Sequence, residues 1–105
     1  MVELYRKLRK AGGAALDIAP QLLNAGTSIG ANLEEATAGQ TKPDFITKNC
    51  IALKESREAR FWLRVIDKTC LLPDDDVTKD IQEARELANI IASIVRNARL
   101  SSNRG

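Results

Sequence analysis

The chain has 105 residues, of which 44% are hydrophobic and 29% charged, with a formal net charge of +2 at pH 7 and no histidine. This composition is typical of one folded domain and excludes a disordered chain, while the missing histidine removes the commonest catalytic base and the commonest transition-metal ligand. Because no apolar run approaches the ~20 residues that span a membrane, and residues 1–10 lack the apolar core of a signal peptide, we expect a cytoplasmic protein without a membrane segment.

The first predicted element is a short basic helix over residues 1–11, with Val2, Tyr5 and Leu8 on its apolar face. Gly12-Gly13 ends this helix. Its length is only ~16 Å, so it can cover only half of the groove between the second and fourth helices. We therefore hypothesise that the uncovered half of the groove is buried by another subunit or by a partner.

A second helix is predicted over residues 14–37, and Pro20 either marks its true start or kinks it. Gly26 and Gly30 each cost about 1 kcal/mol relative to alanine, so we expect them to allow close approach of a neighbour. We interpret Asn32 as a buried polar residue whose amide bonds across the bundle. One face of this helix carries a stripe whose members follow each other at steps of four and three residues, which is typical of a helix packed in a bundle. The stripe comprises Leu22, Gly26, Ile29, Leu33 and Ala36.

A third helix is predicted over residues 43–69, after a helix stop at Ala38-Gly39-Gln40. Thr41 can cap its start, Pro43 suits its first turn, and Asp44 faces the positive end of the helix dipole. Its stripe, which has polar Asn49 at one of its heptad positions, also comprises Phe45, Ala52, Ser56, Ala59, Leu63, Ile66 and Cys70.

The two cysteines, Cys50 and Cys70, fall at the third helix about 30 Å apart, at 1.5 Å per residue. A disulfide needs Cα atoms less than ~7 Å apart, so these two cannot bridge each other within the chain. We interpret both as buried thiols in a reducing compartment.

Residues 72–76 predict a turn with an acidic helix start, and the fourth helix then runs to about Arg99. Residues 101–105 are expected to form a disordered tail, which leaves a single domain over residues 1–100. Because short loops make successive helices antiparallel neighbours, we expect an all-α, antiparallel up-down four-helix bundle with a shortened first helix. The stripe of the fourth helix comprises Val77, Ile81, Ala84, Ala88, Ile91, Val95 and Ala98.

Two blocks, QLLNAGTSIGANLEEA at 21–36 and ALKESREARFWL at 52–63, together with TKPDF at 41–45, resemble the bacterial four-helix-bundle family of 23S rRNA-intervening sequence proteins. The accessory variability protein of diversity-generating retroelements is similar to this family. The resemblance runs from about Leu4 to about Arg99. The matching motif residues include Ser28, Asn32, Glu35, Phe45, Glu55, Glu58 and Trp62.

The resemblance implies a homo-oligomer, with a pentamer favoured, that is not an enzyme and needs no cofactor. It also implies a role connected with structured RNA or with a nucleic-acid enzyme such as a reverse transcriptase. We therefore expect a scaffold that binds RNA or DNA. The alternative is a protein–protein adaptor whose exposed groove takes a partner helix.

Basic side chains supply the candidate nucleic-acid interface. In an up-down bundle the C-terminal residues lie near the turn at 39–42, which makes that end basic. A further basic stripe follows the third helix at steps of three or four residues. Its alternative interpretation is a solvated or salt-bridged face, since Glu55, Glu58 and Asp67 lie nearby and the net charge is only +2. The candidate residues are Lys42, Lys48, Lys54, Arg57, Arg60, Arg64, Arg96 and Arg99.

Two other groups of side chains have more ordinary interpretations. The carboxylates that could cluster between the second and third helices resemble a di-iron site only in part, because such sites also need histidine. We favour salt bridges or subunit contacts for them, and we expect no metal. For Phe61-Trp62 we favour core or subunit-interface packing over stacking on a base. The carboxylates in question are Glu34, Glu35, Glu55 and Glu58.

Overall fold

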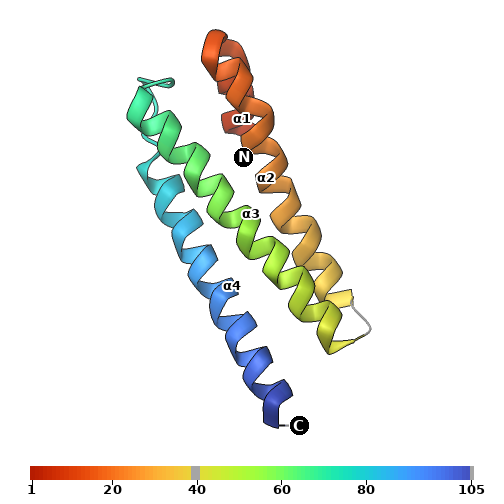
Figure 1. The fold of residues 1–105 in the computed structure, drawn as a ribbon. Coiled ribbons are helices and arrows are strands. Elements are labelled where there is room, and N and C mark those ends of the chain that lie inside the picture. The colour runs from red at the N-terminus through yellow and green to blue at the C-terminus, as the bar shows by residue number, and fades with distance from the viewer. Residues whose placement is uncertain (39–40, 105) are drawn as a thin grey trace.

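The structure, a computed structural model, describes residues 1–38 and 41–104. Its described residues form four helices and no strand, and successive helices run antiparallel (Figure 1). This arrangement confirms the predicted all-α up-down bundle with a short first helix. The helices are α1 (Val2–Ala11), α2 (Gly13–Ala38), α3 (Lys42–Thr69) and α4 (Thr78–Arg104).

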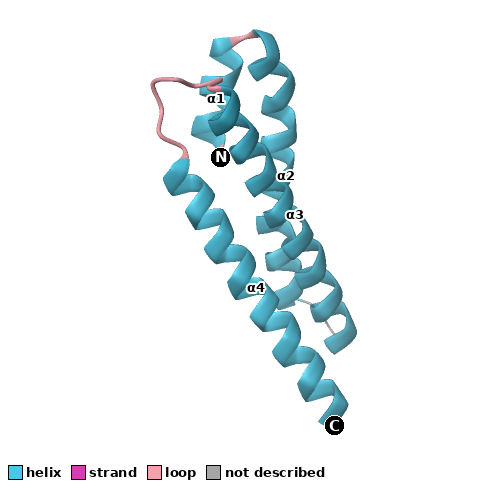
Figure 2. Cartoon of the chain, turned by 60° about the vertical axis from the view of Figure 1, so that its left-hand side comes forward, coloured by secondary structure: helices cyan, strands magenta, loops and turns pink. Residues whose placement is uncertain are grey.

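The central element is α3, because both α2 and α4 pack on it while α1 packs on α2. Within the described ranges, α2 and α4 do not pack closely on each other, and Figure 2 shows α4 lying apart along its lower half. The molecule is correspondingly elongated, with extents of 52 × 20 × 16 Å. The short α1 therefore leaves an open groove between α2 and α4, as its length predicts.

Small buried side chains explain how two helices fit on α3. Ala52, Ser56 and Ala59 are all fully buried on the face of α3 that meets its neighbours. Larger residues fill the spaces between the helices, and the predicted stripes supply most of them. The largest fully buried side chains are Leu8, Leu22, Leu63, Ile66, Ile91 and Ser56.

The predicted signals at the helix ends are confirmed where the structure describes them. Gly12 and Gly13 have φ angles of 72° and 57°, a conformation that favours glycine, and the chain turns there from α1 into α2, which begins at Gly13. The Thr41 Oγ1 accepts a hydrogen bond from the Asp44 N–H at 3.2 Å and so caps α3. Pro20 lies inside α2, which continues through it. The expected stop at 39–40 lies outside the described residues.

Several sequence-based expectations about side chains are wrong. Val2 is 54% exposed, because it lies about 200° around the helix axis from Leu4, which is buried with Leu8. Cys70 is exposed, since α3 ends at Thr69 and Cys70 takes a left-handed conformation with φ of 53°. Cys50 is only half-buried.

The end of α4 also differs from the expected one. The helix extends through residues 101–104, where we expected a disordered tail, and residue 105 lies outside the described part. No glycine or proline occurs between Arg99 and Arg104, so no residue there breaks the helix.

The two glycines inside α2 differ in their surroundings. A Cβ at Gly26 would collide with the Met1 side chain, so the expected close approach is confirmed at this position. A Cβ at Gly30 would meet nothing within 4 Å, so within this chain the expectation is wrong there.

We predict that Gly30→Ala raises the free energy of unfolding of the isolated subunit by up to about 1 kcal/mol, because alanine favours helix and has free space. Gly26→Ala should raise the free energy of unfolding by less, because the new Cβ must displace the Met1 side chain. Urea unfolding followed by circular dichroism measures both. A larger gain from Gly26→Ala than from Gly30→Ala would contradict the structure.

A second prediction concerns acid stability at the start of α4. The Thr78 hydroxyl and N–H donate to Asp76 Oδ1 at 2.5 and 3.0 Å, and they hold the pKa of this carboxyl below its ordinary value of 3.8. The stabilisation is therefore present above that ordinary value and is lost as pH falls through the folded-state pKa.

Asp76→Ala should thus lower the thermal midpoint at neutral pH. The difference in thermal midpoint between this variant and the unchanged chain should become smaller in acid. Thermal unfolding of both chains between about pH 2 and pH 7 tests this, because the range spans the titration of the carboxyl. A difference that stays constant across that range would show that the carboxylate charge contributes nothing.

Candidate nucleic-acid interface

One exposed face of α3 combines cationic and aromatic side chains. Five exposed residues follow each other at alternating steps of three and four, which keeps them on one side of the helix. At 1.5 Å per residue the row is about 21 Å long. We call it the α3 stripe, and it comprises Lys54, Arg57, Phe61, Arg64 and Lys68.

The cations of the α3 stripe have no acidic partner. Among the residues that the structure describes, the ion pairs are Lys7–Asp75 at 2.5 Å and Lys48–Glu35 at 2.7 Å. None of these cations therefore forms the ion pair with Glu55, Glu58 or Asp67 that a salt-bridged face requires, and their exposure also fits the alternative of a solvated face. Four positive charges remain available on one face for an anionic ligand.

Residues of α4 extend this basic surface at its lower end. Arg99 Nη2 donates to Cys50 Sγ at 3.5 Å, and Cys50 lies one turn before Lys54 on α3. Arg96, three residues earlier on α4, is also exposed and donates to Ser93 Oγ at 3.4 Å. The two arginines thus lie beside the start of the α3 stripe.

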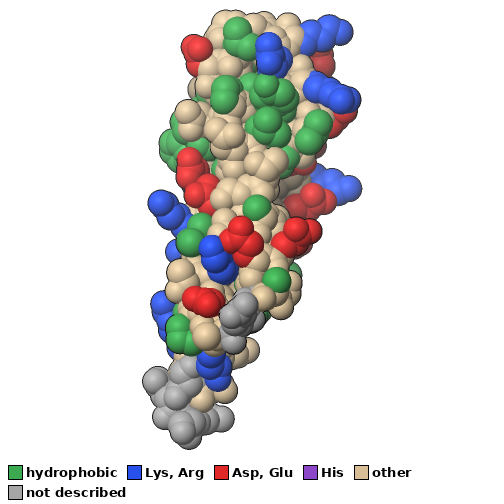
Figure 3. Space-filling model, turned by 90° about the vertical axis from the view of Figure 1, so that its right-hand side faces the viewer, with side chains coloured by type: hydrophobic (Ala, Val, Ile, Leu, Met, Phe, Trp, Pro, Cys, Tyr) green, Lys and Arg blue, Asp and Glu red, His purple; other side chains and the backbone are tan. Residues whose placement is uncertain are grey.

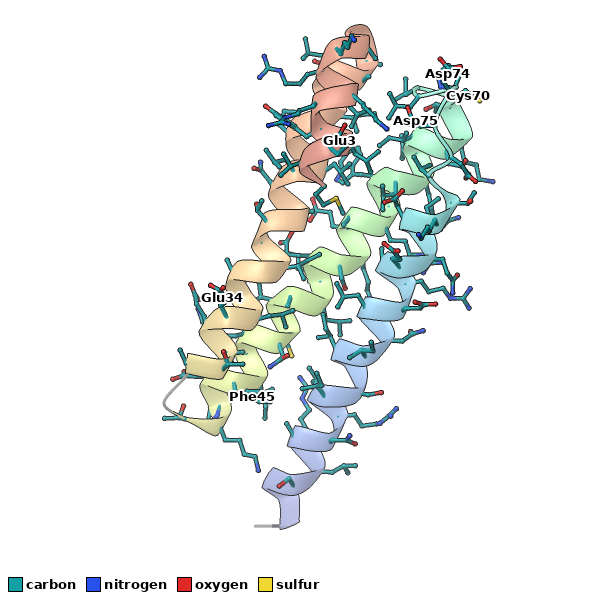
Figure 4. The ribbon with its side chains drawn as sticks, turned by 180° about the vertical axis from the view of Figure 1, so that it is seen from behind. Glu3, Glu34, Phe45, Cys70, Asp74 and Asp75 are labelled. Atoms are coloured by element: carbon teal, nitrogen blue, oxygen red, sulfur yellow. The ribbon has the colours of Figure 1, made fainter. Side chains whose placement is uncertain are left out.

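The C-terminal part of α4 lies near the start of α3, as predicted. Lys42 Nζ donates to Ser101 Oγ at 2.9 Å across these two helices. The acidic turn lies at the other end of the molecule: Figure 4 shows Asp74 and Asp75 far from Phe45. Asp75 there pairs with Lys7 of α1. Lys42 and the C-terminal part of α4 therefore lie at the end of the bundle opposite the acidic turn.

Two of the predicted basic residues have different surroundings. Lys48 pairs with Glu35 of α2, and this hydrogen bond raises the pKa of Lys48 above its ordinary value. It therefore belongs to the α2 side, where acidic and basic side chains are intermixed (Figure 3). Arg60 is half-buried next to the α3 stripe, and its Nε is buried without a hydrogen-bond partner.

Phe61 and Lys68 complete the α3 stripe but were not among the predicted nucleic-acid-binding residues. The signal that could have found them is the continuation of the three-and-four spacing from Lys54 through Arg57 and Arg64. The favoured interpretation of the aromatic pair was core or subunit-interface packing, and the core part is right for Trp62, which packs against the hydrophobic core. Phe61 is 55% exposed and so lies outside the core of the subunit, and packing at a subunit interface stays a prediction for it.

The family-motif residues of α2 and α3 mostly bond within their own helices. Asn32 Nδ2 donates to the Ser28 carbonyl at 2.9 Å and to Ser28 Oγ at 3.1 Å, so the expected bond across the bundle is wrong. Asn49, which is 2% exposed, likewise donates to the Phe45 carbonyl at 2.9 Å. An amide at position i reaches the carbonyl of residue i−4 without a partner helix.

Glu34, Glu55 and Glu58 make no ion pair, and no three acidic, cysteine or histidine side chains converge as a metal site within the described ranges. Glu34 is exposed, whereas Glu55 and Glu58 are half-buried. Subunit contacts remain a prediction for these glutamates. No helix of the described residues has the length and hydropathy to cross a membrane.

Comparison with known proteins places this arrangement in a family. The family model described as 23S rRNA-intervening sequence protein matches residues 1–93. The chain belongs to this family. The resemblance drawn from the two sequence blocks is thereby confirmed, whereas the likeness to the retroelement accessory protein stays a prediction.

A solved structure shows the same fold. It is described as a protein with unknown function from the S23 ribosomal protein family of Bacteroides thetaiotaomicron, and it is 34% identical to this chain. The match has a TM-score of 0.80 and covers 90% of this chain and 86% of that one. No curated protein sequence matches.

Proposed function

We propose that this member of the 23S rRNA-intervening sequence protein family is a non-enzymatic oligomeric scaffold that binds nucleic acid, either structured RNA or an RNA/DNA hybrid. The binding surface is the α3 stripe together with Arg96 and Arg99. The observation that supports this most directly is the row of exposed cations without acidic partners. A polyanion neutralises such a row and releases its own counterions, which favours binding.

The chemistry of the row also suits phosphate. Arg57 and Arg64 present planar guanidinium groups that can each hold two oxygens of one phosphate, and Lys54 and Lys68 add point charges. The net charge of only +2 does not oppose this, because none of the four cations of the α3 stripe forms an ion pair within the described residues. The ligand is attracted by the local charge of this face and not by the net charge of the chain.

We further infer that the scaffold is a homo-oligomer, with five subunits favoured by the family resemblance. The open groove supports self-association, because it holds about 210 Å³ and lies between helices that no other part of the described chain covers. Ile90 on its α4 side is 58% exposed. An oligomer presents several α3 stripes to one nucleic acid, which raises the overall affinity. It can thus hold a template for an enzyme such as a reverse transcriptase.

The same groove favours a second candidate function, a protein–protein adaptor. Its walls are mainly apolar, and Asp80 and Glu83 lie at its rim beside Leu87. An amphipathic partner helix with basic flanks fits such a surface. In this function the α3 stripe plays no part, and salt has little effect on binding.

We predict that replacing Lys54, Arg57 and Arg64 together by glutamine weakens binding to a labelled structured RNA. It should also make the fall of the binding constant with salt less steep: the slope of log binding constant against log salt concentration should shrink in magnitude by about 2 to 3, because up to three phosphate contacts are lost. Fluorescence anisotropy over a range of salt concentrations measures both. The matched control replaces the exposed Arg6, Lys10 and Lys79, which removes the same charge elsewhere. Equal effects of the two triple variants would reject the α3 stripe as the binding surface.

A further prediction concerns the groove. Ile90→Asp should dissociate the oligomer toward the 11.5 kDa subunit, because a carboxylate cannot be buried in an apolar contact without a partner. Asn89→Asp, at the neighbouring exposed position, should leave the mass unchanged. Light scattering measures both. An unchanged mass for Ile90→Asp contradicts the groove as a subunit contact, and loss of a protein partner in this variant would favour the adaptor.

A further inference from the structure

Phe61 lies at the middle of the α3 stripe, in the row of cations. Arg57 precedes it by four residues and Arg64 follows it by three, while Lys54 and Lys68 lie seven residues away on either side. All four are exposed, and none forms an ion pair in the part of the chain that the structure describes. A ligand that neutralises these charges therefore passes directly over the phenyl ring.

The ring makes one aromatic contact, although it is largely open to solvent. The edge of the Trp62 ring meets Phe61, with centroids 5.0 Å apart and planes at 73°, and Trp62 itself packs against the core. Phe61 also borders a surface hollow of about 290 Å³, which it shares with Arg64, Val65 and Lys68. A phenyl side chain has only two torsions, so it loses little conformational entropy when a flat ligand covers it.

We propose that Phe61 is a stacking platform for an unpaired base, so that the α3 stripe binds a single-stranded segment of the nucleic acid. This inference rests on the proposed function and narrows its ligand class. In a duplex each base is already covered by its neighbours, and only an unpaired base offers a free face to the ring. Flanking cations then hold the phosphates on both sides of the stacked base, as in other single-strand binders.

A duplex gains less from binding at this position than a single strand does. It would meet the four cations equally well, but it would leave Phe61 facing sugar and phosphate groups without any stacking partner. The aromatic ring at the centre of the row therefore favours a single strand.

The test compares the full chain with Phe61→Ala, Phe61→Leu and Phe61→Trp. Each binds an oligouridylate of about twelve nucleotides, within the site sizes of single-strand binders, and a blunt RNA duplex of equal length. Fluorescence anisotropy gives the affinities, and light scattering gives the oligomeric mass. Phe61→Ala should lose about five- to a hundredfold in affinity for the single strand and little for the duplex. Phe61→Leu should resemble Phe61→Ala, and Phe61→Trp should retain the affinity.

Two readouts separate stacking from charge and from folding. The salt dependence of binding should stay the same in Phe61→Ala, because no charge is removed. Trp62 is the single tryptophan of the chain, so its emission reports events at the neighbouring ring. Its emission should change when the oligouridylate binds the unaltered chain, and it should change much less in Phe61→Ala.

The outcomes that overturn the inference are distinct from failure of the proposed function. If the chain binds nucleic acid but Phe61→Ala keeps its full single-strand affinity, stacking is rejected and the scaffold stands. If Phe61→Ala changes the oligomeric mass and the affinity follows the mass, Phe61 is a subunit contact and stacking is again rejected. If the unaltered chain binds neither probe, the proposed function itself fails.

Discussion

The packing of two helices on α3 is the constraint on which the rest of the structure depends. Ala52, Ser56 and Ala59 are small enough to let α2 and α4 approach the same helix from two directions. The short α1 has only ten residues and, among the described helices, packs closely on α2, so it leaves the gap between α2 and α4 open. Two surfaces result from this one arrangement: an open apolar groove between α2 and α4, and an uncovered outer face of α3.

The charges of the chain are distributed in keeping with that arrangement. The acidic turn before α4 lies beside the basic α1, and Lys7 and Asp75 form an ion pair between them. On the α2 side, Glu35 forms an ion pair with Lys48. The four cations of the α3 stripe form no ion pair within the described residues. A basic face and an apolar groove on different sides of one subunit suit a protein that assembles through one surface and binds its ligand through the other.

Periodicity in the sequence predicts the helices and most of their buried stripes, because the apolar spacing and the caps are local properties. The cap of α3 at Thr41 and the break at Gly12-Gly13 are examples. Details that depend on one side chain's surroundings were not predictable in the same way. Asn32 could bond across the bundle or within α2, and only the packing decides. For Phe61, spacing shows which face it occupies, but the number of helices around α3 determines whether that face is covered.

The central claim is that nucleic acid lies along the outer face of α3. Photo-cross-linking of the assembled protein to thiouridine-containing RNA, followed by trypsin digestion and mass spectrometry, tests it most directly. Trypsin cuts after Arg60 and Arg64, so Phe61–Arg64 is released as a separate peptide. The account predicts cross-links on this peptide and near Arg99. Cross-links confined to α2 or to the walls of the open groove would contradict it.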